Sequence, residues 1–136
     1  MSVIVTDNGF GKDDWNAGFA PIEGAANAQG LDLTSDTDVS DILDRLPKTQ
    51  MIRIDFPSFA DGRGFTLARL LRLNGYSGRL RACGHVIADQ YAMARRAGFD
   101  EVEISDDLAT RQPEDQWLAR ANWQAHDYQS RLKRRA

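Results

Sequence analysis

The feature that most constrains this chain is a regular alternation of strand-like and helix-like segments. Period-2 apolar patterns mark the strands, and apolar residues three or four apart mark helices that stop at glycine, asparagine or proline. In order the sequence predicts strands at 3–5 and 31–33, a short helix at 39–46, a strand at 51–56, a helix capped by Thr66, a strand at 78–83, a helix at 86–97, a strand at 102–104 and a helix from about 113 to 132. This order predicts an α/β fold, a mainly parallel sheet of about four strands covered by helices.

We expect one domain over residues 1–136, because no repeat, low-complexity tract or linker divides the chain. The glycine-rich stretch at about 8–30 is expected to be an irregular lead-in. The alternation fits an open flavodoxin-like sandwich and a partial (β/α) barrel alike. In both, the loops after the strands gather at the carboxyl edge of the sheet, where α/β proteins bind ligands. These loops are 55–65, 83–85 and 105–107.

Charge is unevenly distributed along the chain. The whole sequence carries a net charge of -3, but residues 51–99 hold eight arginines against three aspartates, a net of +5 between acidic ends. This basic centre is either an anion-handling site or a set of ion pairs with those ends. No apolar run approaches the roughly 18 residues of a membrane span and no signal peptide is evident, so we expect a cytoplasmic protein without membrane contact.

The cysteine and histidine content limits the chemistry that the chain can carry. Cys83 is the single cysteine, which excludes an internal disulfide and an iron–sulfur cluster held by the chain's own cysteines. Two histidines, His85 and His126, without a recognisable acidic pair predict no metal site, and no cofactor motif is evident. Cys83 beside His85 permits a nucleophile, but a lone cysteine at a strand end is more often a small buried side chain.

The loop after strand 51–56 is the first candidate ligand site. Gly62 and Gly64 flank Arg63 just before a helix, so the backbone can approach a ligand and the helix start offers free N–H groups. Arg63 above them is suited to hold an oxyanion. Alternatively, Asp61 pairs with Arg63 and holds a glycine turn. Asp55, at the end of the strand, is a weaker candidate.

A second cluster of candidates contains Arg81, Asp89 and Gln90. Gln90 falls with Met93 in the predicted apolar stripe of its helix, so it must find hydrogen bonds if it is buried. Asp89 has no basic residue three or four positions away on its helix. We expect both to reach a structural partner such as Arg63 or Arg81, with a ligand as the alternative.

The C-terminal region suggests an interface but no nucleic-acid site. On the predicted last helix, Trp123 points away from the stripe that holds Trp117, so it is a candidate contact for another subunit or protein. The basic end at 131–135 could touch nucleic acid, but a pI near 5.3 and the lack of interleaved aromatics favour a solvated helix end.

Three blocks carry a resemblance to a known family. They resemble a bacterial family named domain-of-unknown-function family 934 and span Ile54–Arg72, Gly75–Ala82 and Gly84–Gln90. Residues 96–100 also fit the family, and the resemblance covers roughly residues 35 to 105. Members of that family are typically encoded beside assimilatory sulfite or nitrite reductase and are often labelled probable oxidoreductases. The positions that match, and where a family site would lie, are Asp61, Gly62, Arg63, Gly64, Arg81, Asp89 and Gln90. The chain departs from the family pattern at His85 and Ala97.

The resemblance implies an accessory protein of assimilatory sulfate and sulfite reduction without a redox centre of its own. Its partner would be a sulfite or nitrite reductase or another protein of sulfur assimilation. An alternative is a small-anion-binding enzyme or sensor, in which Asp61, Arg63, Arg81 and Asp89 converge on sulfate, sulfite or phosphate. A third is a structural homodimer that uses Trp123.

Overall fold

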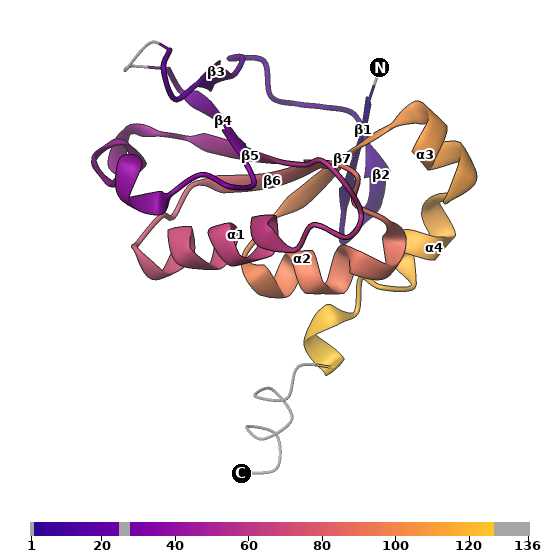
Figure 1. The fold of residues 1–136 in the computed structure, drawn as a ribbon. Coiled ribbons are helices and arrows are strands. Elements are labelled where there is room, and N and C mark those ends of the chain that lie inside the picture. The colour runs from indigo at the N-terminus through magenta and orange to yellow at the C-terminus, as the bar shows by residue number, and fades with distance from the viewer. Residues whose placement is uncertain (1, 25–27, 127–136) are drawn as a thin grey trace.

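One open sheet of seven strands organises the described part of the chain (Figure 1). The computed structural model describes residues 2–24 and 28–126. In spatial order the strands are β2-β1-β7-β6-β5-β4-β3; those from β3 to β7 run parallel, whereas β1 pairs antiparallel with β7 and β2. Their bounds are β1 (Ser2–Thr6), β2 (Gly9–Gly11), β3 (Ala20–Pro21), β4 (Gly30–Thr34), β5 (Met51–Phe56), β6 (Arg79–Gly84) and β7 (Glu101–Ser105). The α/β prediction is confirmed, with a mixed, mostly parallel sheet of seven strands instead of about four.

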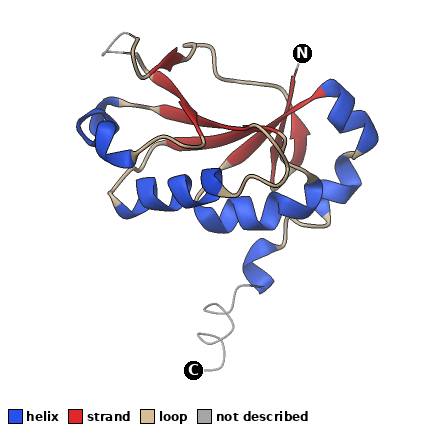
Figure 2. Ribbon diagram, in the orientation of Figure 1, coloured by secondary structure: helices blue, strands red, loops and turns tan. Residues whose placement is uncertain are grey.

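The two longest of the described helices lie together on one face of the sheet (Figure 2). The helices are η1 (Val39–Asp41), η2 (Leu43–Lys48), α1 (Arg63–Leu73), η3 (Ala88–Gln90), α2 (Tyr91–Ala97), α3 (Asp106–Arg111), α4 (Glu114–Leu118) and η4 (Trp123–His126). Strands β4 to β7 are neighbours in chain order, and right-handed crossovers between such neighbours place successive helices on the same face. Among the described strands this parallel order does not reverse, so it forms no topological switch point of the doubly wound kind.

The apolar core lies between the sheet and helices α1 and α2. On β5, Ile52, Ile54 and Phe56 are buried in this core, while Arg53 and Asp55 point to the opposite face, as the pleat of a strand requires. Helix α1 contributes Leu67 and Leu71 to the same core. The helix-covered face of the sheet is therefore apolar, and its other face is free to carry charge.

All four predicted helices differ in part from the observed ones. The segment predicted as one helix at 86–97 begins as the 3₁₀ helix η3 at Ala88 and becomes α-helical at Tyr91. Segment 39–46 forms two 3₁₀ helices, with Pro47 inside the second; a proline cannot donate the backbone hydrogen bond that an α-helix needs. Helix α1 begins at Arg63, not after Thr66, because a carboxylate just before it accepts from its first N–H.

The predicted helix from 113 to 132 is broken in its described part, since α4 ends at Leu118 and η4 begins at Trp123. The remainder of that helix and the basic end at 131–135 lie outside the described residues. The lead-in predicted at 8–30 contains the short strands β2 and β3. Within residues 2–24 and 28–126, no helix is long and apolar enough to cross a membrane.

Candidate functional site

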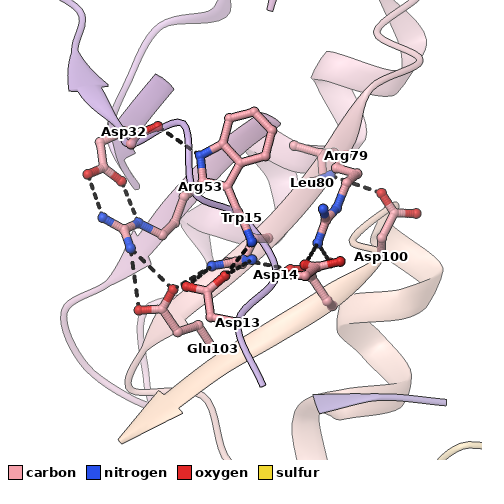
Figure 3. Close-up of polar contacts among 12 residues, drawn as sticks. Asp13, Asp14, Trp15, Asp32, Arg53, Arg79, Leu80, Asp100 and Glu103 are labelled. Atoms are coloured by element: carbon pink, nitrogen blue, oxygen red, sulfur yellow. Dashed lines mark hydrogen bonds and ion pairs between the residues drawn. The ribbon is translucent and has the colours of Figure 1, made fainter. Parts of the chain in front are cut away.

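A row of charged side chains covers the face of the sheet that α1 and α2 leave free (Figure 3). Cα partners across the parallel strands are Asp32 with Arg53, Arg53 with Arg81, and Arg81 with Glu101. Partners in register point to the same face, so charges of opposite sign stand beside one another across four strands. We call this surface the charged face; its members are Asp32, Arg53, Arg79, Arg81, Glu101 and Glu103.

Arg81 lies at the centre of the charged face and is completely buried. Its Nε donates to Glu101 at 2.6 Å, its Nη1 to Glu103 at 2.9 Å and its Nη2 to Asp13 at 2.9 Å. Burial acts to lower the pKa of Arg81, but the hydrogen bonds and the attraction of these carboxylates outweigh it and raise the pKa above its ordinary value. Arg81 is therefore a structural cation that three carboxylates hold.

Arg53 continues the row toward the edge of the sheet. It binds the Asp32 carboxylate through Nε and Nη2, both at 2.7 Å, and its Nη1 donates to Glu103 at 3.2 Å. The ring of Phe19 lies 3.9 Å from its guanidinium carbon, a cation–π contact. The Asp32 hydrogen bonds raise the pKa of Arg53 above its ordinary value. Arg53 thus joins β4 to β7 across the sheet.

Residues 13–19, which we call the strap, cross the charged face and close it. Asp13 binds Arg81, and Asp14 binds Arg79 at 2.8 Å. These arginine hydrogen bonds hold the pKa values of both aspartates below the ordinary range. Trp15 Nε1 donates to Gly18 O at 2.8 Å and stabilises the bend of the strap. This part of the basic centre therefore forms ion pairs with the acidic ends of the chain, one of the two alternatives that the sequence left open.

Asp61 and Arg63 form a closed pair at the start of α1. The Asp61 carboxylate accepts from the backbone N and the Nε of Arg63, both at 3.0 Å, from its Nη2 at 2.9 Å, and from Ser35 Oγ at 2.9 Å. The Arg63 hydrogen bonds hold the pKa of Asp61 well below its ordinary range. The carboxylate therefore occupies the place at the helix start where an oxyanion would bind, and Arg63 is the first residue of α1 instead of a loop residue.

The two glycines beside Arg63 differ in what they require. A Cβ placed on Gly64 would lie 2.7 and 2.8 Å from ring carbons of Phe56, so close packing of α1 on β5 requires glycine there. Around Gly62 nothing lies within 4 Å of such a Cβ, and its φ of -86° is ordinary for any residue. Gly64 is therefore a packing residue, whereas Gly62 has open space beside it.

Asp89 and Gln90 find partners other than the expected Arg63 and Arg81. Asp89 accepts from Arg120 Nη2 at 2.7 Å on an exposed surface. Gln90 accepts from Ile87 N at 3.0 Å and donates to Phe59 O at 2.8 Å, which ties the loops after β5 and β6 together. The four side chains that the anion hypothesis requires do not converge: Arg81 lies beneath the strap, Asp61 and Arg63 at the start of α1, and Asp89 beside Arg120.

A cleft of about 470 Å³ opens at the carboxyl ends of β6 and β7. It brings together two of the weaker candidates, Cys83 and His85, with Phe59 from the loop after β5. Cys83 Sγ lies 3.9 Å from Asp55 Oδ1, and burial raises the pKa of the thiol to about 12. The ring of His85 packs edge-on against Phe59 at 5.1 Å. Cys83 is thus a neutral thiol at pH 7, which does not favour a nucleophile.

Trp123 packs against its own chain. Its indole Nε1 donates to Asp7 Oδ2 at 3.3 Å, and the guanidinium carbon of Arg95 lies 4.8 Å from its ring centroid. It is half-buried in this position. The predicted interface residue therefore already has an intramolecular role, the attachment of η4 to α2.

The sequence interpretation did not select Arg53, Glu103, Arg111 or Phe59 as site residues, although all four line the cleft. It also missed Asp13, the strap residue that holds Arg81. The signal for the charged face was present, because Arg53, Arg79, Arg81, Glu101 and Glu103 occupy alternate positions of three consecutive strands.

Comparison with protein families identifies the family of this chain. Residues 30–136 match the family described as "Bacterial protein of unknown function (DUF934)". The chain belongs to this family. The match starts at the first residue of β4, so β1 and the strap lie before it, although Asp13 reaches Arg81 inside the matched part. A search of curated proteins found no match.

Proposed function

We propose that this protein is an accessory protein of assimilatory sulfate and sulfite reduction, which acts by binding a sulfite or nitrite reductase and contributes no redox centre. Membership in the DUF934 family supports the proposal, because the resemblance to that family implies an association with such reductases. The observation that carries it is that each charged side chain among the family-matched positions is already bound by another residue of the same chain, and that these contacts lie at separate places.

Each of these side chains already serves the fold. Arg81 is held by three carboxylates, Asp61 by Arg63 and a serine, and Asp89 by Arg120. A small ligand at Arg81 would have to displace buried ion pairs, and the loss of one partner from such a pair costs about 3–5 kcal/mol. These positions therefore favour a scaffold that presents a surface to another protein over a site that binds a small molecule.

Growth on defined sulfur sources tests the proposal. A strain without this protein is expected to grow slowly with sulfate or sulfite as the sole sulfur source, and normally with sulfide or cysteine. Sulfide is the product of the reduction, so this pattern places the defect at the reductase step. The gene for the wild-type protein must restore growth. Normal growth of the deletion strain on sulfate and on sulfite would refute the proposal.

A second candidate function is the binding of a small anion at the carboxyl-edge cleft. Its volume of about 470 Å³ lies within the range of ligand pockets, and His85 and Arg111 line it with exposed side chains. Calorimetry with sulfate, sulfite and phosphate is expected to detect binding that is lost in His85→Ala and in Arg111→Ala. Absence of heat at millimolar anion, or equal binding by both variants, would exclude this function.

A further inference from the structure

The outer surface of helices α1 and α2 exposes large apolar side chains. Leu70 is 38% exposed, Leu73 75% and Met93 54%. The two helices lie side by side on the same face of the sheet (Figure 1). Phe65, Thr66, Arg69, Met93 and Ala97 line a shallow groove of about 170 Å³ between them. We call this surface the α1–α2 face.

The apolar residues of the α1–α2 face are adjacent. Residues three or four apart on a helix are neighbours, so Leu73 lies next to both Leu70 and Arg69, and Arg69 lines the groove with Met93. Leu70 also borders a second hollow, together with Ser35, Asp36 and Thr37. Single exposed apolar side chains need no explanation, but several that adjoin one another indicate a contact surface. No element among the described residues covers Leu70, Leu73 or Met93, since all three side chains remain exposed.

The α1–α2 face is also basic. Helices α1 and α2 contain five arginines and no acidic residue. Three of these arginines pair with acidic side chains elsewhere: Arg63 with Asp61, Arg72 with Asp100 and Arg95 with Asp7.

The other two arginines of these helices, Arg69 and Arg96, form no ion pair with a described residue. Arg69 is exposed, and no described residue pairs with it. Arg96 is exposed, and within residues 2–24 and 28–126 it donates only to the backbone carbonyl of Trp123. Neither cation has an acidic partner in the part of the chain that the structure describes, and each borders an exposed apolar residue on its own helix, Arg69 beside Leu73 and Arg96 beside Met93.

We infer that the α1–α2 face binds a protein partner that presents an apolar patch bordered by aspartate or glutamate. This inference rests on the proposed function, in which the partner is the reductase, and adds the surface and the chemistry of the contact. Protein interfaces are enriched in Met and Arg, with an apolar centre and a polar rim. Opposite charge at the rim speeds association and fixes the orientation of the partner.

Two other occupants fit the charge pattern less well. A symmetric dimer would place the α1–α2 face against its own copy, with Arg69 and Arg96 of one protomer facing the same cations of the other. An anionic membrane typically attracts clusters of about four to eight basic residues, whereas two exposed arginines border this face. An acidic protein surface neutralises both cations and covers the leucines and the methionine.

The test measures binding of the purified full-length protein to the purified sulfite reductase of the same source by biolayer interferometry. The double variant Leu73→Ala/Met93→Ala is expected to weaken binding at least about tenfold. Arg69→Glu is expected to weaken it by about tenfold as well, mainly through slower association, with a smaller salt dependence. Matched controls are Leu43→Ala and Lys48→Glu, which alter an exposed leucine and an exposed basic residue outside the α1–α2 face. Both controls must bind as the wild type does.

A photo-crosslinker at position 73 gives a readout that does not depend on the reductase. In the producing cells, Leu73→p-benzoylphenylalanine is expected to crosslink to an apolar segment bordered by acidic residues, and the same replacement of Leu43 is not. If the reductase binds but the α1–α2 variants bind equally well, the inference is refuted and the proposed function stands. If the reductase does not bind and the crosslink maps to an acidic segment of another protein, the inference stands and the proposed partner is wrong. Crosslinks to a second copy, to lipid or to nothing refute the inference.

Discussion

Replacement of Arg81 by methionine is expected to destabilise the fold by about 3 kcal/mol. Methionine has a similar length and no charge, so the change leaves Glu101 and Glu103 without their shared cation. Their side chains are only 6% and 18% exposed. Loss of one partner from a buried ion pair costs about 3–5 kcal/mol, and the low end applies because Glu101 keeps Arg79 at 2.6 Å and Glu103 keeps Arg53 at 3.2 Å.

Equilibrium unfolding in urea, followed by tryptophan fluorescence, measures this loss. With a slope of about 1.5 kcal/mol per molar urea, a loss of 3 kcal/mol lowers the midpoint by about 2 M. The control is Arg111→Met, because Arg111 and its partner Asp107 are 63% and 81% exposed. Such an exposed pair contributes less than about 0.5 kcal/mol. The contrast between the two arginines isolates the effect of burial.

A double variant separates the loss of the cation from the burial of an unpaired carboxylate. Arg81→Met/Glu101→Met removes both members of the closest pair, which are 2.6 Å apart. It is expected to be more stable than Arg81→Met alone, because apolar pairs replace buried ion pairs at little cost. Two results would refute the structural role of Arg81. One is a loss of stability in Arg81→Met no larger than that in Arg111→Met, and the other is a further loss of about 3 kcal/mol when Glu101→Met is added.

Three further predictions concern the strap, the start of α1 and the cleft. Asp13→Asn is expected to reduce the loss of stability between about pH 5 and pH 2 in acid titrations, because a carboxylate whose pKa is lowered in the folded state stabilises it at higher pH and loses that contribution on protonation. Gly64→Ala is expected to lower stability by about 1–3 kcal/mol through its contact with Phe56, while Gly62→Ala changes it by less than about 0.5 kcal/mol in thermal unfolding. Iodoacetamide should modify Cys83 at pH 8 at least about a hundredfold more slowly than free cysteine, with a rate that still rises toward pH 10 in mass-spectrometric time courses.

The sequence predicted best those elements whose local pattern and tertiary environment agree. Strand β5 was predicted with its observed bounds, since alternating Ile52 and Ile54 bury one face and Pro57 ends the strand. The end of α2 at Gly98 was also predicted, because its φ of 119° favours glycine. Strands β2 and β3 could not be predicted, because two or three residues carry no periodicity and pairing with β1 and β4 creates them.

The buried side of a helix was harder to predict where aromatic and smaller apolar residues lie on different sides of it. In α2 the predicted apolar stripe included Met93, which is 54% exposed, and left out Tyr91, which is fully buried. Tyr91 packs edge-on against Trp117 of α4, with ring centroids 6.2 Å apart. Only the fold shows this contact, because α4 lies more than twenty residues further along the chain and its packing rotates the buried side of α2.

The candidate site illustrates the limit of reasoning by sequence blocks. Asp61, Arg63, Arg81 and Asp89 belong to blocks in the right order, but order along the chain does not determine which side chains meet. Arg81 points to the helix-free face because it alternates with Leu80 and Ala82, which are buried in the core beneath the helices. Arg63 begins a helix on the other side of the sheet. Convergence of the two would require Arg81 to lie on the opposite face of its strand.

The same geometry separates the stability of the protein from its proposed binding. The arginines of β5 and β6 form ion pairs on the charged face beneath the strap. Arg69 and Arg96 lie on helices that cover the opposite face of the sheet, and their side chains are exposed. The sheet and its apolar core lie between the two sets, so substitutions in one set share no partner with those in the other, and their effects on stability should add. Arg81→Met must therefore lower the free energy of unfolding without changing the affinity of the folded protein for its partner. Arg69→Glu must do the reverse, and a variant pair that failed to separate in this way would contradict both the structural role of Arg81 and the binding role of the α1–α2 face.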